Sequence, residues 1–169
     1  RVLQRCELVL RAGRWQWDWE ALERTVDARS RLLLLCSPHN PVGRVFDADE
    51  LRQLADFAAR HNLLICADEI HCGLVLDAER AHRPIAALDE AAARRTITLM
   101  APSKTWNIPA LYCAFAIIPD PALRRRYRHA MRGVVPHVNV LGMVAAEAAY
   151  RDGDAWRQAL LDYLRGNRE

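Results

Sequence analysis

At 169 residues the chain is about one domain long, and a composition of 51% hydrophobic and 27% charged residues is ordinary for a globular protein. The net charge of +3 is too small to indicate a nucleic-acid partner, and we expect none. No apolar run approaches the roughly 18 residues that a membrane span needs, so we expect no membrane partner either.

The first clear element is the apolar run RLLLLCS at 31–37, which predicts a strand buried on both faces. Two prolines, an asparagine and a glycine make the next stretch, SPHNPVG at 37–43, a loop. The segment 47–62 then has its apolar residues at helical spacing. Asp47 is the predicted N-cap of this helix, and Glu50, three residues later, completes a capping box.

The rest of the chain continues to alternate strands and helices, apart from a loop-rich stretch at 72–95. The further predicted elements are strands at 63–69, 96–100 and 113–119 and helices at 120–132, 138–151 and 154–166. Strands that are unbroken apolar runs and that alternate with helices indicate an α/β fold with a mostly parallel sheet.

Polar residues that follow the predicted strands are the candidate site residues. In an α/β sheet, ligands bind in the crevice beyond the carboxyl ends of the strands, so side chains in these loops are expected to converge. The candidates are Asn40, Asp68, His71, Ser103 and Lys104.

Lys104 is the single lysine among 24 basic residues. Lysine, unlike arginine, can lose its proton when desolvated, and it can hold an aldehyde as a Schiff base. The common aldehyde cofactor is pyridoxal phosphate (PLP), which needs an acid at its pyridine nitrogen, a donor at its ring hydroxyl and further donors at its phosphate. Asp68, Asn40 and Ser103 are of these residue types.

A metal site is a second interpretation of the same region. The run CADEIHC at 66–72 offers Cys66, Asp68, His71 and Cys72 as ligands. It contains neither a C-x-x-C pair nor an H-E-x-x-H helix, the spacings typical of zinc sites, and we therefore expect no metal.

The motifs SPHNPVG, ADEIHCGLV and APSKTWN, in this order and spacing, resemble the successive signatures of fold-type I PLP enzymes of the aminotransferase class I/II family. They are most similar to the carbon–sulfur lyase subgroup, the MalY/PatB-type cystathionine β-lyases. The resemblance extends over nearly the whole chain. It implies a three-layer α/β/α fold and PLP as the cofactor.

The resemblance also implies a role for each candidate. Lys104 would form the Schiff base with PLP and then act as the base at the substrate Cα. Asp68 would pair with the pyridine nitrogen, Asn40 and His71 would reach the ring hydroxyl, and Ser103 would contact the phosphate. Histidine at position 71 is typical of the lyase subgroup, because aminotransferases usually carry a tyrosine there.

The implied reaction is α,β-elimination, in which a small sulfur-containing amino acid of the cystathionine or cysteine type yields a thiol, pyruvate and ammonia. An aminotransferase of the same fold is one alternative, and a truncated, catalytically silent chain is another. Aminotransferases of this class usually carry a phosphate-binding arginine eight residues after the lysine. This chain has Tyr112 at that position, which favours the lyase.

The resemblance further predicts how the chain is organised. Family chains are longer, and this one starts with Arg1 and stops within a helical pattern, so we expect a fragment. Residues 1–152 would be part of the PLP-binding large domain, and 153–169 would begin the helix leading into the small domain. The longer parent is expected to be a homodimer. Five cysteines, an odd number, together with the lack of a signal peptide predict reduced thiols and a cytoplasmic protein.

Overall fold

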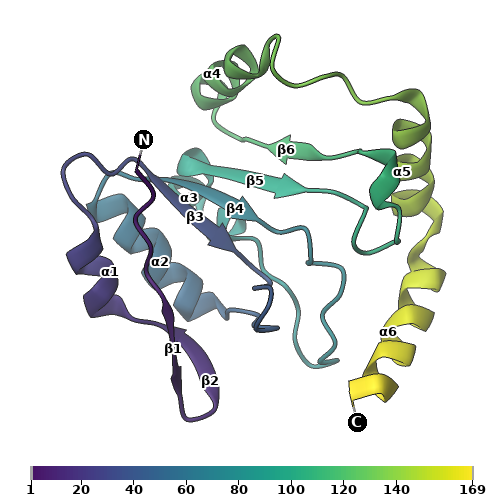
Figure 1. The fold of residues 1–169 in the computed structure, drawn as a ribbon, viewed down its shortest axis with the longest axis horizontal. Coiled ribbons are helices and arrows are strands. Elements are labelled where there is room, and N and C mark those ends of the chain that lie inside the picture. The colour runs from purple at the N-terminus through teal and green to yellow at the C-terminus, as the bar shows by residue number, and fades with distance from the viewer. Residues whose placement is uncertain (1, 169) are drawn as a thin grey trace.

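The computed structural model describes residues 2–168, with a four-stranded sheet at the centre and a separate two-stranded hairpin (Figure 1). The hairpin pairs β1 (Leu8–Arg11) with β2 (Arg14–Trp17). The main sheet has the order β3 (Leu32–Cys36), β4 (Leu64–Asp68), β5 (Thr96–Met100) and β6 (Phe115–Ile117). Strands β3, β4 and β5 are parallel, and β6 runs antiparallel to β5, so the predicted mostly parallel sheet is confirmed.

Within the described residues, six helices and two short 3₁₀ turns surround this sheet. The helices are α1 (Trp19–Thr25), α2 (Ala48–Arg60), α3 (Glu90–Arg95), α4 (Pro121–Met131), α5 (Val140–Asp152) and α6 (Asp154–Arg168), and the 3₁₀ turns are η1 (Ile85–Ala87) and η2 (Pro109–Leu111). Helices α5 and α6 form one column on the side of the molecule toward which β3, β4 and β5 point (Figure 1). No helix within 2–168 is long and apolar enough to cross a membrane.

Helix α2 begins as its sequence predicts. The Asp47 side chain accepts a hydrogen bond from the Glu50 backbone N–H at 3.0 Å, and the Glu50 carboxylate accepts one from the Asp47 N–H at 2.8 Å. This reciprocal pair satisfies two backbone donors that the first helical turn leaves free. Leu51, Leu54 and Phe57 recur at helical spacing and are buried, so α2 packs on the sheet through one apolar face.

Apolar clusters on both faces of the sheet make the fold three-layered. Ile65 belongs to a cluster that joins β3 and β4 to α1, α2, η1 and α3. Leu64 precedes it in β4 and points to the opposite face, where it packs with Ile97 and with Leu123 of α4. The helices before β5 therefore cover one face of the sheet, and α4 covers part of the other.

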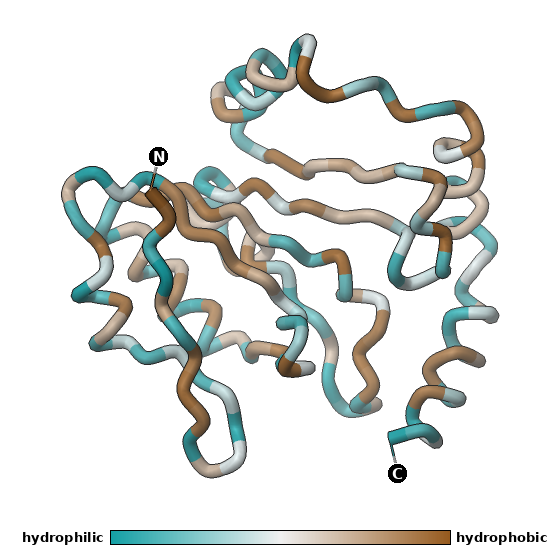
Figure 2. Tube along the Cα trace, viewed as in Figure 1, coloured by the Kyte–Doolittle hydropathy of each residue, from teal (hydrophilic) through white to brown (hydrophobic). Residues whose placement is uncertain are grey.

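The expectation that the strand at 31–37 is buried on both faces is wrong. Leu35 is 6% exposed and faces α2, but Leu32 and Leu34 are 50% and 63% exposed. The reason is that β3 is an edge strand, and the cluster that α4 forms on this face reaches β4, β5 and β6 but not β3. Figure 2 shows the run as a continuous hydrophobic stretch along this edge.

Candidate active site

The site residues follow from the way the parallel strands end together. Cys36 at the end of β3 lies opposite Asp68 at the end of β4, and Asp68 lies opposite Leu99 of β5. Two backbone hydrogen bonds extend this pairing past the strands, from Ser37 N–H to the Asp68 carbonyl and from Glu69 N–H to the Leu99 carbonyl, both at 3.0 Å. The loops after all three strands therefore start at one edge of the sheet.

Each predicted site residue lies at this edge or in a loop that leaves it. Asp68 is the last residue of β4, with an exposed side chain, and one carboxylate oxygen accepts a hydrogen bond from the Ile70 N–H at 3.1 Å. Ser103 and Lys104 lie in the turns after β5, and Lys104 is exposed. Asn40 lies in the loop after β3, and His71 in the turn after β4.

The loop that carries Asn40 is closed by its own backbone. His39 N–H donates to the Arg44 carbonyl at 2.7 Å, and Arg44 N–H returns a bond to the His39 carbonyl at 3.3 Å. Gly43 allows this closure because its φ of 65° lies in the left-handed region, which side chains disfavour. The Arg44 guanidinium is buried, bonds the Trp15 carbonyl at 2.9 Å and pairs with Glu50 at the start of α2.

A close approach at Gly73 brings the turn after β4 against the turn after β5. A Cβ at Gly73 would lie 3.1 Å from the Thr105 Cβ and closer still to its Oγ1 and Cγ2. Thr105 is 2% exposed, so the side chain next to Lys104 fills the space that the glycine leaves. The absence of a side chain at position 73 thus lets the His71 turn and the Lys104 turn pack together.

The Lys104 turn is also held from its other side, by the junction of α5 and α6. Trp106 Nε1–H donates to the Gly153 carbonyl at 3.0 Å, and its ring meets that of Tyr150 edge-on at 4.7 Å between centroids. Within the turn, Ile108 N–H bonds the Ser103 carbonyl at 3.1 Å. The backbone on both sides of Lys104 is therefore anchored, while its side chain is exposed.

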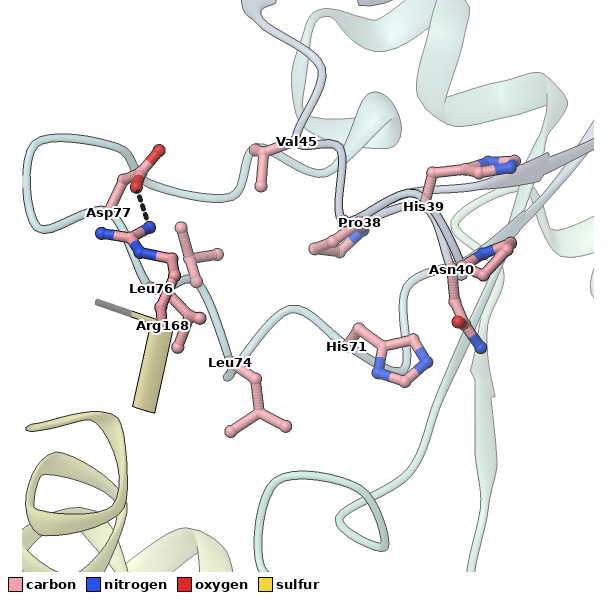
Figure 3. A pocket seen from close by; sticks show the side chains of 12 residues that line it. Pro38, His39, Asn40, Val45, His71, Leu74, Leu76, Asp77 and Arg168 are labelled. Carbon is pink, nitrogen blue, oxygen red and sulfur yellow. Dashed lines mark hydrogen bonds and ion pairs between the residues drawn. The ribbon is translucent and has the colours of Figure 1, made fainter. Parts of the chain in front are cut away.

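A cavity of about 370 Å³ lies beside the Asn40 loop, and Figure 3 shows the side chains that line it. Asn40 and His71 line it at one end, and the ion pair of Asp77 with Arg168, at 2.6 Å, lies at the other. Asp68, Ser103 and Lys104 do not line this cavity. The structure therefore brings Asn40 and His71 to one cavity wall and leaves the other three candidates at the neighbouring sheet edge.

The polar side-chain atoms of the five candidate residues are available to bind a ligand. Within residues 2–168 the side chains of Asn40, His71, Ser103 and Lys104 make no hydrogen bond or ion pair, and Asp68 keeps one carboxylate oxygen unbonded. An amine, a carboxylate, an amide and a hydroxyl in this arrangement are the donor and acceptor types that PLP requires. The residues present fit this cofactor.

The two thiols nearest to Asp68 in the sequence are poor nucleophiles. Burial raises the pKa of Cys66 above its ordinary value, and the neighbouring Asp68 carboxylate raises it further. Burial likewise raises the pKa of Cys72, and the carboxylate of Glu69 adds to the effect. A raised pKa keeps both side chains in the thiol form near neutral pH, and the thiol is a poor nucleophile because the thiolate is the reactive form.

Among the described residues no group of three or more His, Cys, Asp or Glu side chains could hold a metal.

The sequence indicates that Glu69, beside these candidates, is an ion-pair partner, but it does not identify the residue with which Glu69 pairs. Glu69, the residue after Asp68, is 1% exposed and contacts His82 Nε2 at 2.8 Å. The dipeptide Asp68-Glu69 marks the position of a second carboxylate, but nothing in the sequence indicates that a histidine 13 residues later returns to it.

The sequence is similar to those of known proteins. The sequence matches the model of the aminotransferase class I and II family over residues 2–168. It is 35% identical over 162 residues to cystathionine beta-lyase PatB of Bacillus subtilis (strain 168), an alignment that covers 95% of this chain. This chain spans 42% of the length of that relative.

Two solved structures have the same arrangement of elements. The crystal structure of OvoB superposes with a TM-score of 0.93 and 49% identity, covering 96% of this chain and 43% of that one. Cystalysin from Treponema denticola, whose crystal structure contains pyridoxal 5'-phosphate, superposes with a TM-score of 0.87 and 34% identity. That match covers 93% of this chain and 40% of cystalysin.

Proposed function

This chain belongs to the aminotransferase class I and II family, and on that premise we propose that it contributes the PLP site of a carbon–sulfur β-lyase. The substrate class is a small amino acid with a sulfur leaving group on Cβ, of the cystathionine or cysteine type. The products of the α,β-elimination are a thiol, pyruvate and ammonia. The similarity to cystathionine beta-lyase PatB and to PLP-containing cystalysin supports both the reaction class and the cofactor.

In this proposal each of the five side chains has a defined role. The Lys104 amine would hold the cofactor aldehyde and would also take the proton from the substrate Cα. Asp68 places a negative charge at the pyridine nitrogen. Asn40 and His71 donate to the ring hydroxyl, and the Ser103 hydroxyl donates to the phosphate. PLP, when bound, supplies an electron sink for the negative charge that develops at Cα.

A single observation carries the proposal. The only lysine of the chain follows β5 at the edge where Asp68 ends β4, and its amine is exposed and unpaired within residues 2–168. Lys104 thus follows the strand that pairs with the one Asp68 ends, at the carboxyl ends of the parallel strands. That edge is where α/β folds bind their ligands.

An aminotransferase is the second candidate, because it shares the family and the residues described so far. Tyr112 favours the lyase. It occupies the place of the phosphate-binding arginine that the family resemblance assigns to aminotransferases. The Tyr112 side chain is 83% exposed, and its φ of 50° turns the chain sharply at that point.

We further propose the organisation and location expected from the sequence. Residues 1–152 would belong to the cofactor-binding domain and 153–169 to the start of a second one, which the break between α5 and α6 at Gly153 supports. A homodimer of the longer parent is supported by apolar side chains exposed on and before α5, a pattern typical of interaction surfaces. These side chains are Val134, Val135, Val140, Leu141, Met143 and Val144. Five unpaired cysteines support a reducing, cytoplasmic location.

The test uses the single lysine. PLP is added to the 169-residue chain, the adduct is reduced with borohydride, and the labelled residue is mapped by mass spectrometry. We expect a label at Lys104 that is absent from Lys104→Ala. The matched control is Lys104→Arg, which keeps the positive charge but cannot form a Schiff base, and it should remain unlabelled as well.

The substrate test is made on a separate PLP-loaded sample that has not been reduced, because borohydride reduction blocks the Lys104 amine. Cystathionine should yield pyruvate, while keto-acid exchange would indicate the aminotransferase instead. A label found only on the N-terminal amine, or no label at all, would mean that this chain has no PLP site of its own. The same mapping on a longer protein containing this sequence then shows whether the missing segments or the assignment of Lys104 is responsible.

A further inference from the structure

Glu69 is a carboxylate that the proposed reaction does not use, although it follows Asp68 directly. Its side chain is 1% exposed, and burying a carboxylate is costly unless partners compensate for its lost hydration. Two partners are present. His82 Nε2 lies 2.8 Å from one oxygen, and the Ile85 N–H donates to the other at 3.3 Å.

The backbone of Glu69 links the same residue to the candidate site. Its N–H donates to the Leu99 carbonyl in β5, and its carbonyl accepts from the Cys72 N–H, both at 3.0 Å. The first bond ties the end of β4 to the strand that leads to Lys104. The second closes the turn that carries His71. The first bond therefore helps to fix the position of Asp68, and the second helps to fix the position of His71.

His82 depends on Glu69 in return. Its side chain is 8% exposed, and within residues 2–168 its Nδ1 has no hydrogen-bond partner. The only polar contact of the ring is therefore the one with the Glu69 carboxylate. Through this contact the segment that enters η1 is fixed against the end of β4. A buried pair of this kind is weak evidence for stability, because well-packed apolar residues often replace such pairs without loss.

We propose that Glu69 and His82 are positioning residues, which hold the end of β4 and the turn after it so that Asp68 and His71 face the cofactor. This inference rests on the proposed PLP site. The pair acts through backbone placement and touches neither cofactor nor substrate. Its effect should therefore be local to the Asp68 edge, and it should be measurable even before PLP is added.

A second His–Glu pair of the chain, more exposed than the first, serves as the control. His61 Nε2 contacts a Glu23 carboxylate oxygen at the same distance of 2.8 Å, but it joins α2 to α1 at the other end of the helical layer. The test variants are Glu69→Ala and His82→Leu, the conservative variant is Glu69→Gln, and the control is His61→Leu. Glu69→Gln keeps an oxygen that can accept from the Ile85 N–H. Melting temperatures of all four variants show which measurements are made on folded protein.

The first readout needs no cofactor. Amide hydrogen exchange of Ser37, Glu69 and Cys72 is followed by NMR in the 169-residue chain. In Glu69→Ala and His82→Leu these amides should exchange about tenfold faster relative to the amides of β1 and β2, because the local opening becomes easier. Glu69→Gln should recover most of the protection. Equal exchange at these three amides in His82→Leu and His61→Leu would overturn the inference.

The second readout is PLP affinity, measured by absorbance titration and by the extent of Lys104 labelling. Glu69→Ala and His82→Leu should bind PLP about tenfold more weakly, which corresponds to about 1.4 kcal/mol. Glu69→Gln and His61→Leu should stay close to the original chain. Affinities that follow the melting temperature alone, whichever pair is altered, contradict a positioning role. An original chain that takes no label contradicts the proposed PLP site instead, and the exchange data still decide whether the pair positions Asp68.

Discussion

At the scale of single residues, Gly73 decides how closely two loops of the candidate site approach. It is the last residue of the turn that carries His71, and the buried Thr105 next to Lys104 occupies the space where its side chain would be. Arg157 of α6 also donates to the Gly73 carbonyl, at 3.4 Å. Any side chain at this position has to push the two turns apart.

We therefore expect Gly73→Ala to lower the free energy of unfolding by about 1–3 kcal/mol, the range for overpacking a filled site. Rotation of the threonine side chain cannot relieve the contact, because the added carbon would lie 3.1 Å from the Thr105 Cβ itself. Urea denaturation measures the change. The control is Gly166→Ala in α6, where nothing lies within 4 Å, and where alanine should raise stability by about 0.5–1 kcal/mol. Equal effects at the two positions would refute the role of Thr105.

At the scale of single elements, the start of α2 joins the core to the loop that carries Asn40. Its capping box and the Arg44–Glu50 pair meet on the same glutamate, because Glu50 closes the first turn with one oxygen and binds Arg44 with the other. Arg44 in turn closes the loop after β3 through its backbone. The stability of this helix end is thereby coupled to the shape of the Asn40 loop.

We expect Asp47→Ala to reduce the free energy of unfolding by about 0.5–2 kcal/mol, the cost of losing an N-cap side chain. Asp49→Ala keeps the cap and loses only a charge near the helix start, so it should cost about 0.3 kcal/mol. Thermal denaturation of the two variants separates capping from charge.

The stability lost in Asp47→Ala should depend on pH. The Glu50 backbone N–H, bonded to the Asp47 carboxylate, holds the pKa of Asp47 below its ordinary value, and the nearby Arg14 lowers it further. A carboxyl with a lowered folded-state pKa stabilises the protein above its ordinary pKa, and this contribution is lost as the pH falls through the folded-state pKa. The stability difference between the original chain and Asp47→Ala should therefore be largest near neutral pH and shrink on acidification. A difference that grows in acid would contradict this account.

At the scale of the whole molecule, the two faces of the sheet are covered unequally. Helices α1, α2 and α3 bury the face that includes Leu35, Ile65 and Ala67, while the cluster at α4 covers the other face only over β4, β5 and β6. Leu32 and Leu34 are left exposed on β3. The cavity near Asn40 and the exposed side chains of the site lie toward the α5–α6 column, at the carboxyl end of the same sheet.

Because the two faces differ in burial, alanine substitutions of two adjacent leucines should change the free energy of unfolding by very different amounts. Leu35→Ala should lower the free energy of unfolding by about 2–5 kcal/mol, because it opens a cavity under α2. Leu34→Ala, one residue earlier, should change it by less than about 0.5 kcal/mol, since that side chain is 63% exposed. Urea denaturation of both variants provides the comparison. A large loss at Leu34 would mean that the exposed face is covered in solution.

The alternation of apolar runs with amphipathic segments determined the fold class and nearly all elements from β3 onward. Strand β5 was predicted at 96–100 and observed at Thr96–Met100, and the box formed by Asp47 and Glu50 was readable from two residues three apart. The candidate residues were placed in strand-end loops because local sequence marks where a strand stops. The hairpin and the short helices α1 and α3 were not predicted, since their segments are too short for a clear periodic pattern.

The tertiary structure decided what depends on contacts between distant residues. Periodicity shows that a residue is apolar and in a strand, but only the packed layers show that Leu35 is buried and Leu34 is not. The fit of Thr105 against Gly73, and the return of His82 to Glu69, join loops that no sequence spacing connects. The sequence determined by itself which groups could hold a cofactor, because that is a property of residue type. Whether the loops that carry these groups start at the same edge depends on how the strands pair in the sheet.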